Sequence, residues 1–116
     1  MKQKPLLPSL REKKRYLVYE VLSDQDFDAV ELSGSIKDNY SDLYGVKGVS
    51  EAGLLFPKGG FDKKRNRGII RVADGFLDEL RSSFVFISGI NGKNAIVRSV
   101  IATGMMKRAK EIMSAS

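Results

Sequence analysis

Two of the residue types that often carry out chemistry in proteins, histidine and cysteine, are missing from this chain. Its 116 residues include no histidine and no cysteine, which excludes a serine–histidine triad, a thiol nucleophile and cysteine-held zinc or iron–sulfur sites. Asp24, Asp28 and Glu31 have spacings that share one helix face, as a magnesium site requires. These acids alternate with the apolar stripe of a predicted helix, which favours the interpretation that they form the solvated side of that helix. We therefore predict no catalytic residue and no metal ligand.

Basic side chains are the other group that could bind a ligand. The chain carries 20 Lys and Arg against 14 Asp and Glu, a net charge of +6. Residues 1–15 hold six basic and one acidic residue, residues 16–57 hold two and eight, and residues 58–116 hold twelve and five. Folding could gather these blocks into a positive face, which suits nucleic acid, and a negative face, which suits a basic protein partner.

The basic residues of the C-terminal half are the predicted RNA contacts. Arg71 and Arg98 each interrupt an apolar strand, where a charge is costly unless it is exposed or paired, so an ion pair or an exposed sheet position is the alternative for both. The strand from Arg67 to Val72 lacks the stacking aromatics of an RNA recognition motif. We therefore expect contacts with the phosphates and 2′-hydroxyls of folded RNA. The candidates are Lys58, Lys63, Lys64, Arg65, Arg67, Arg71, Lys93, Arg98, Lys107, Arg108 and Lys110.

The elements that must position these residues follow from periodicity and turn signals. Residues 1–14 contain two prolines and a basic run, which is typical of a flexible basic arm. Residues 15–116 are predicted to form a single RNA-binding domain. Strands are predicted at 16–22, 53–56, 68–72, 83–88 and 95–102, and helices at 27–44, just after Asp74 and at 103–113, with Gly45 as a helix cap, a loop at 45–52 and an Asn91–Gly92 turn.

This order of elements predicts the fold class. Without the last strand and helix it is the split βαβ arrangement of ferredoxin-like domains and RNA recognition motifs. We predict an α/β domain of the α+β sandwich kind, whose antiparallel sheet gains an extra C-terminal strand and helix. The first two helices would cover one face of the sheet, and the third would cover part of the other.

The N-terminal residues bear on localisation. No stretch approaches the roughly 20 apolar residues of a membrane span. Pro5 and Pro8 interrupt the continuous apolar run that a signal peptide needs. We therefore expect a cytoplasmic protein that does not bind membranes.

Four short segments together resemble a known family. They are Arg15-Tyr-Leu-Val-Tyr-Glu-Val-Leu-Ser23, Gly68-Ile-Ile-Arg-Val72, Ile90-Asn-Gly-Lys93 and Ile96-Val-Arg-Ser99. In this order and spacing they resemble the archaeal ribonuclease P protein component 2 family, which is related to a small eukaryotic subunit of ribonuclease P and MRP. The resemblance runs from about Arg15 to Lys110.

The resemblance implies a subunit of the ribonucleoprotein that removes 5′ leaders from precursor tRNA. It implies that ribonuclease P RNA is the catalyst, that Mg²⁺ is bound by that RNA, and that the protein is not an endonuclease alone. It also implies a TIM-barrel ribonuclease P subunit as partner, self-association within a heterotetramer, and only indirect contact with precursor tRNA. The alternative is a ferredoxin-like protein-interaction or regulatory domain without RNA.

Overall fold

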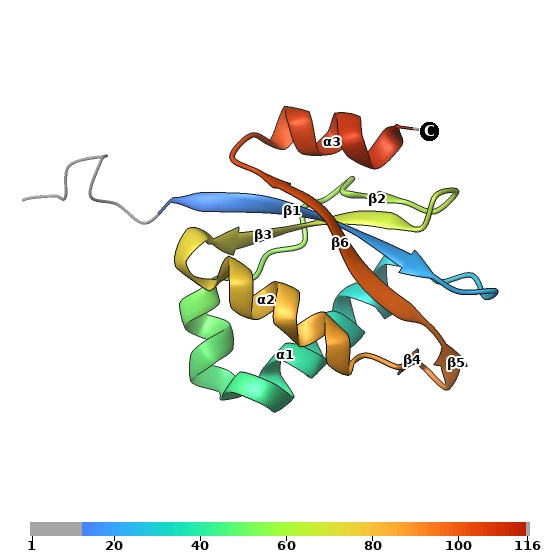
Figure 1. Ribbon diagram of the computed structural model, residues 1–116, viewed down its shortest axis with the longest axis horizontal. Coiled ribbons are helices and arrows are strands. Elements are labelled where there is room, and N and C mark those ends of the chain that lie inside the picture. Colours follow the sequence, from blue (N-terminus) through green and yellow to red (C-terminus); the bar gives the residue numbers. More distant parts are fainter. Residues whose placement is uncertain (1–12, 116) are drawn as a thin grey trace, which may run out of the picture.

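The computed structural model describes residues 13–115 of the chain (Figure 1). Its elements, in which η marks a single 3-10 turn, are β1 (Lys14–Leu22), α1 (Ala29–Ala52), β2 (Phe61–Asp62), β3 (Arg67–Ala73), η2 (Asp74–Phe76), α2 (Leu77–Ser83), η3 (Phe84–Phe86), β4 (Gly89–Ile90), β5 (Lys93–Asn94), β6 (Ile96–Thr103) and α3 (Met106–Ser114). Of the predicted arm, residues 1–12 lie outside the described part, whereas Lys14 already belongs to β1.

Four strands form one antiparallel sheet in the order β2-β3-β1-β6. With α1 between β1 and β2, and α2 between β3 and β6, this is the split βαβ arrangement. The central strand β1 pairs Leu17 with Ile70 of β3 and Val18 with Ile101 of β6. The predicted α+β class and antiparallel sheet are confirmed.

Both faces of the sheet are covered because β1 is apolar on both sides. Leu17, Tyr19 and Val21 belong to the main core, which includes buried residues of α1 and α2. Val18 alternates to the other face, where it packs with Ile69 of β3 and the buried side of α3. Figure 1 accordingly shows α1 and α2 on one face and α3 on the other.

The first helix is longer than predicted. The predicted loop at 45–52 is wrong, because α1 continues to Ala52, which is buried. Gly45 is not the cap: at φ 76° it forms a kink between two helical segments. The C-cap is Gly53, at φ 61°, whose N–H donates to the carbonyl of Val49. A glycine permits either a kink or a cap, and packing of the second segment on the core decides between them.

Two predicted strands are also wrong. Residues 83–88 are not a strand, because Phe84–Phe86 form the turn η3, so β6 takes the fourth position in the sheet and is not an extra strand. The strand predicted at 53–56 is reduced to a single bridge between Leu55 and Arg71. The second strand, β2, begins only at Phe61, after Pro57 and the two glycines that follow it. The predicted Asn91–Gly92 turn is confirmed, since both residues have positive φ between β4 and β5.

Candidate RNA-binding surface

The carboxylate of Glu20 joins two of the predicted RNA-binding arginines. Its Oε2 accepts a hydrogen bond from Arg67 Nε at 2.9 Å, and its Oε1 accepts one from Arg98 Nε at 2.9 Å. The three residues are cross-strand neighbours, because β1 lies between β3 and β6 in this register. For Arg98 the structure therefore shows the ion-pair alternative, although its side chain stays 59% exposed.

Arg67 is also bonded to the end of α3. Its Nη1 donates to the carbonyl oxygens of Ile112, at 3.2 Å, and Ala115, at 2.6 Å. Carbonyls at a helix C-terminus lack partners within the helix and carry partial negative charge, so a guanidinium satisfies them well. The side chain is only 20% exposed. Arg67 therefore fastens α3 to the sheet, and most of its donors are already used.

Replacing Glu20 by glutamine should lower the free energy of unfolding by about 2 kcal/mol at pH 7, because it leaves Arg67 and Arg98 uncompensated. The hydrogen bond from Arg67, reinforced by Arg98, holds the pKa of Glu20 below its ordinary value. A depressed folded-state pKa means that this stabilisation is present above the ordinary pKa of glutamate and is lost as pH falls through the lower, folded-state pKa.

Urea unfolding of both proteins at several pH values between 7 and 3 measures this difference. The gap between wild type and variant should shrink as the pH falls. Glu111→Gln is the control, because Glu111 pairs with Arg108 at an exposed site and should cost less than about 1 kcal/mol. Equal losses in the two variants, or a gap that does not change with pH, would contradict the role of Glu20.

Arg71, unlike Arg67 and Arg98 on the same sheet, makes no ion pair with Glu20. It lies opposite Tyr16 of β1 and alternates with Ile70 and Val72, so it shares the α3 side of the sheet with Ile69. It is half-buried, its Nε is buried without a hydrogen-bond partner, and it has no ion pair within residues 13–115. An arginine keeps its charge, so Arg71 carries a positive charge that no acid among residues 13–115 pairs with.

The third helix presents a basic side to solvent. Ala109 and Met113 are buried against the sheet, and the 3.6-residue period places Lys107 and Lys110 on the outside, where both are exposed. Neither has an acid within 4.0 Å in the described part of the chain. Arg108 is exposed too, 3.5 Å from Glu111.

The β2–β3 turn extends this basic side. Lys63 and Lys64 are exposed there, whereas Arg65 is held by Asp62 at 3.0 Å. The turn lies beside the C-terminal end of α3 (Figure 1), to which Arg67 bonds. The name "α3 surface" is used below for this region, made up of Lys63, Lys64, Arg65, Lys107, Arg108 and Lys110.

Besides the three strand arginines described above, two predicted contacts lie outside the α3 surface. Lys93 lies in the β4–β5 hairpin near the start of α1, on the opposite side of the sheet from α3 (Figure 1). Its Nζ is 3.3 Å from the carbonyl oxygen of Asp26 and 5.2 Å from the centre of the Phe27 ring. Lys58 lines a hollow beside Ala29 and Val30 of α1.

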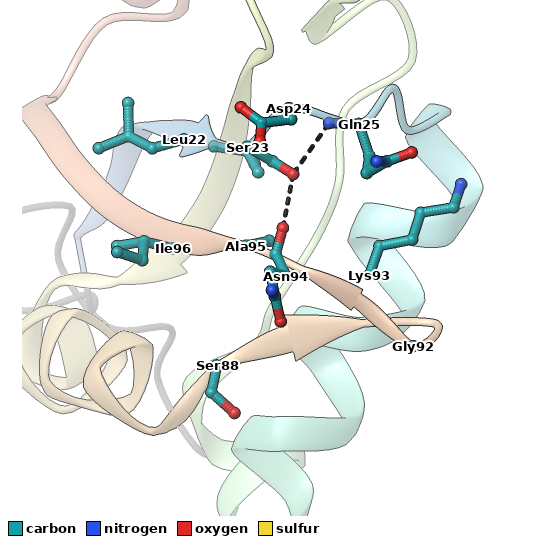
Figure 2. Close-up of a pocket in the computed structure, with 11 residues that line it drawn as sticks. Leu22, Ser23, Asp24, Gln25, Ser88, Gly92, Lys93, Asn94, Ala95 and Ile96 are labelled. Atoms are coloured by element: carbon teal, nitrogen blue, oxygen red, sulfur yellow. Dashed lines mark hydrogen bonds between the residues drawn. The ribbon is translucent and has the colours of Figure 1, made fainter.

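A groove that the sequence did not indicate runs between the end of β1 and the β4–β5 hairpin (Figure 2). It has a volume of about 960 Å³. Ser23 crosses it, with its Oγ donating to the carbonyl of Asn94 and accepting from the N–H of Gln25. Figure 2 shows the amine of Lys93 turned away from this pair, and Asp24 adds a carboxylate. The groove is therefore poorly suited to phosphate.

Two of the three acids that were weighed as metal ligands, Asp28 and Glu31, cap the start of α1. Asp28 Oδ1 accepts from the N–H of Glu31 at 2.7 Å, and Glu31 Oε1 accepts from the N–H of Asp28, which makes the capping box of α1. Within residues 13–115 no three histidine, cysteine, aspartate or glutamate residues could hold a metal ion together. The helices of that same range include none that is long and apolar enough to cross a membrane.

Comparison with known proteins places the sequence of this chain in one family. A family model described as the Rpp14/Pop5 family covers residues 15–114. The chain belongs to this family. The match confirms the family resemblance predicted from the sequence.

Curated relatives of this Rpp14/Pop5 family protein align over nearly its whole length. It is 33% identical to "Ribonuclease P protein component 2" of Pyrococcus abyssi, over 96% of this chain and 92% of the relative. The protein of the same name from Thermococcus gammatolerans is 35% identical, over 95% and 92% of the two chains. That from Methanosarcina barkeri is 37% identical, over 93% and 77%.

A solved structure shares the fold of this family member. It is a chain in the cryo-EM structure of yeast ribonuclease MRP, with a TM-score of 0.62. The likeness covers 81% of this chain and 76% of the other, at 14% sequence identity. At that identity it shows the fold alone.

Proposed function

We propose that this protein is a subunit of ribonuclease P and supports the catalytic RNA as it removes 5′ leaders from precursor tRNA. The observation that carries the proposal is the match, over more than nine-tenths of the chain, to relatives named ribonuclease P protein component 2. The α3 surface supports the same role, because its lysines have no ion-pair partner in the described part of the chain. Such cations displace the counterions of RNA phosphates.

In this role the protein contributes cations and shape, and the RNA with its Mg²⁺ ions performs the cleavage. Lys107 and Lys110 on α3, with Lys63 and Lys64 on the neighbouring turn, would contact successive phosphates of folded RNA. Arg71 would add a guanidinium at the edge of this surface. Bringing fixed positive charge to a folded RNA favours its compact form, because phosphates repel one another strongly.

The proposal includes the partners that the family resemblance implies. These are ribonuclease P RNA, a TIM-barrel ribonuclease P subunit, and a second copy of this chain within a heterotetramer. Precursor tRNA would be contacted only indirectly, through the RNA, and the complex would act in the cytoplasm of an archaeal cell.

Reconstitution tests this function directly. Leaving the protein out of a mixture of ribonuclease P RNA and the other subunits should lower the rate of precursor-tRNA cleavage at least about 10-fold. The purified protein alone should cleave nothing. Its affinity for the RNA should fall with salt along a log–log slope of about −0.7 to −0.9 for each phosphate neutralised.

Two outcomes would contradict the proposal. Unchanged cleavage without the protein would remove the ribonuclease P role, and a flat salt response would remove the phosphate contacts. Binding to a protein partner without any binding to RNA would instead favour the alternative, a protein-interaction domain.

A further inference from the structure

The hollow beside Lys58 lies at the β2 edge of the sheet, between the start of α1 and residues 56–61. Its volume is about 380 Å³, which falls within the roughly 300–1,000 Å³ of sites for small organic groups. Of the described residues that line it, none is acidic and Lys58 alone is basic. Apolar side chains make up most of its walls: Ala29, Val30, Phe56, Pro57 and Phe61. The name "β2-edge hollow" is used for it below.

The hydroxyl of Tyr19 faces the β2-edge hollow without a hydrogen-bond partner. Tyr19 is only 2% exposed, and yet it lines the hollow. The hydroxyl end of its ring lies over Gly68, the β3 residue that pairs with Phe61 of β2, so this end is the part of Tyr19 directed toward the hollow. Among residues 13–115 the hydroxyl makes no hydrogen bond.

This hydroxyl is a donor that a ligand could use. Burial raises the pKa of Tyr19 above its ordinary value, so the group stays protonated at neutral pH. Buried polar groups are almost always hydrogen-bonded, because a bond left unmade costs free energy. An acceptor atom that enters the hollow would make the missing bond, and a purely apolar occupant would not.

Lys58 connects the hollow to the proposed RNA-binding surface. Its side chain is exposed, and it has no acid within 4.0 Å in the part of the chain that the structure describes. The edge strand β2 is only two residues long, so Lys63 and Lys64 of the α3 surface follow directly after the wall of the hollow. RNA on the α3 surface would therefore reach the hollow around the edge strand, without crossing the sheet.

Resting on the proposed function, we propose that the β2-edge hollow receives a base of ribonuclease P RNA that has turned out of its stack. A base is flat and apolar on its faces and carries acceptor atoms on its edge. Its faces would contact the walls of the hollow, and the Tyr19 hydroxyl would donate to its edge. Lys58 would pair with a neighbouring phosphate.

The chemistry of the hollow disfavours two other occupants. A phosphate would face apolar walls, which cannot replace the water around its charge. An aliphatic side chain of a protein would leave the Tyr19 hydroxyl unpaired. Because every RNA base carries acceptor atoms, the hollow recognises an unstacked nucleotide and not a particular sequence.

Replacing Tyr19 by phenylalanine removes only the hydroxyl oxygen. Fluorescence anisotropy with ribonuclease P RNA, at about 0.15 M salt, should show an affinity about fivefold lower, because the bond to the base is lost. Urea unfolding should show no loss of stability, because the hydroxyl has no partner in the free protein. Tyr40→Phe is the matched control: its hydroxyl donates to Glu79, so its loss should lower stability and leave RNA affinity unchanged.

Val30→Glu tests the mouth of the hollow. Val30 is 79% exposed there, and a carboxylate would obstruct the base and repel the phosphate beside it, so RNA affinity should fall at least about 10-fold. Acidic residues are favourable in the first turn of a helix, so α1 should stay folded. The matched control is Val46→Glu, because Val46 is 83% exposed on the second segment of α1. Its affinity should stay within about threefold of wild type.

The outcomes separate the hollow from the function on which it rests. Equal losses in Val30→Glu and Val46→Glu, or full RNA affinity in Tyr19→Phe, would overturn the hollow as a base site. The ribonuclease P role would still stand in that case if charge reversal at Lys107 and Lys110 weakened RNA binding. A wild-type chain that binds no RNA would overturn both.

Hydrogen–deuterium exchange of the wild-type complex gives a measurement that requires no variant. Residues 29–33 and 56–61 should become protected when ribonuclease P RNA binds. Protection of α3 and the β2–β3 turn alone would overturn the base site. Protection of these two segments by another protein subunit, and not by RNA, would show that the occupant is a protein and would also overturn the proposal.

Discussion

Replacing Lys107 and Lys110 by glutamate should lower the affinity of the protein for ribonuclease P RNA roughly 100-fold at about 0.1 M salt. Both side chains are exposed on the outer side of α3, so the change removes two cations that neutralise phosphates and adds two repulsive charges. Lysine and glutamate have similar helix propensity, so α3 should stay folded. Fluorescence anisotropy across a salt series measures the effect, and the slope should shrink by about 0.7–0.9 for each phosphate that the variant no longer neutralises.

The matched control is Lys37→Glu/Lys47→Glu. These lysines are exposed on α1, across the sheet from α3, and their replacement changes the net charge by the same amount. A loss of less than about fivefold is expected, from long-range repulsion alone. Equal losses in the two double variants would show that RNA responds to the overall charge of the protein and not to the α3 surface.

Replacing Gly68 by alanine should lower the free energy of unfolding by about 2–3 kcal/mol. Tyr19 of β1 is the cross-strand partner of Gly68 in β3, and its ring lies over Gly68. A Cβ built at Gly68 would come within 2.6 Å of Tyr19 Cε1. Tyr19 is buried in the main core and cannot move away without disturbing it. Urea unfolding followed by circular dichroism measures the loss.

Two further variants show whether the clash causes this loss. Gly34→Ala is the control, because nothing lies within 4 Å of a Cβ built there and the residue is helical; it should raise stability by up to about 1 kcal/mol. Adding Tyr19→Leu to Gly68→Ala should recover part of the loss, which a double-mutant cycle measures as coupling between the two sites. Additive effects would show that Gly68 is needed for another reason.

The position of α3 explains why this protein can lack the aromatics of an RNA recognition motif. In that motif bases stack on the exposed face of the central strands. Here the corresponding face carries Val18 and Ile69, which are buried under Ala109 and Met113 of α3. Bases cannot reach the centre of the sheet, so we propose the outer side of α3 as the surface that meets RNA. Arg67 holds this helix in place through its bonds to the last carbonyls.

The sequence predicted correctly those elements whose hydrophobic pattern and turn residues indicate the same structure. The apolar residues on both faces of β1, the Asn91–Gly92 turn and the amphipathic pattern of α3 each depend on neighbours within a few residues, so they could be found in the sequence. The apolar run from Phe84 to Ile87 was ambiguous, because a short apolar run is compatible with a strand or a turn. Burial of Phe84 in the core decided for the turn.

The partners of the charged residues, by contrast, were decided by tertiary structure. Composition and order alone determined that the protein has a basic C-terminal half and lacks histidine and cysteine. Only strand register brings Glu20 between Arg67 and Arg98, residues that are 47 and 78 positions away along the chain, and leaves Arg71 without an acid in the described part. An ion pair forms over a few ångströms, and such proximity between distant residues arises only when the sheet and helices pack together.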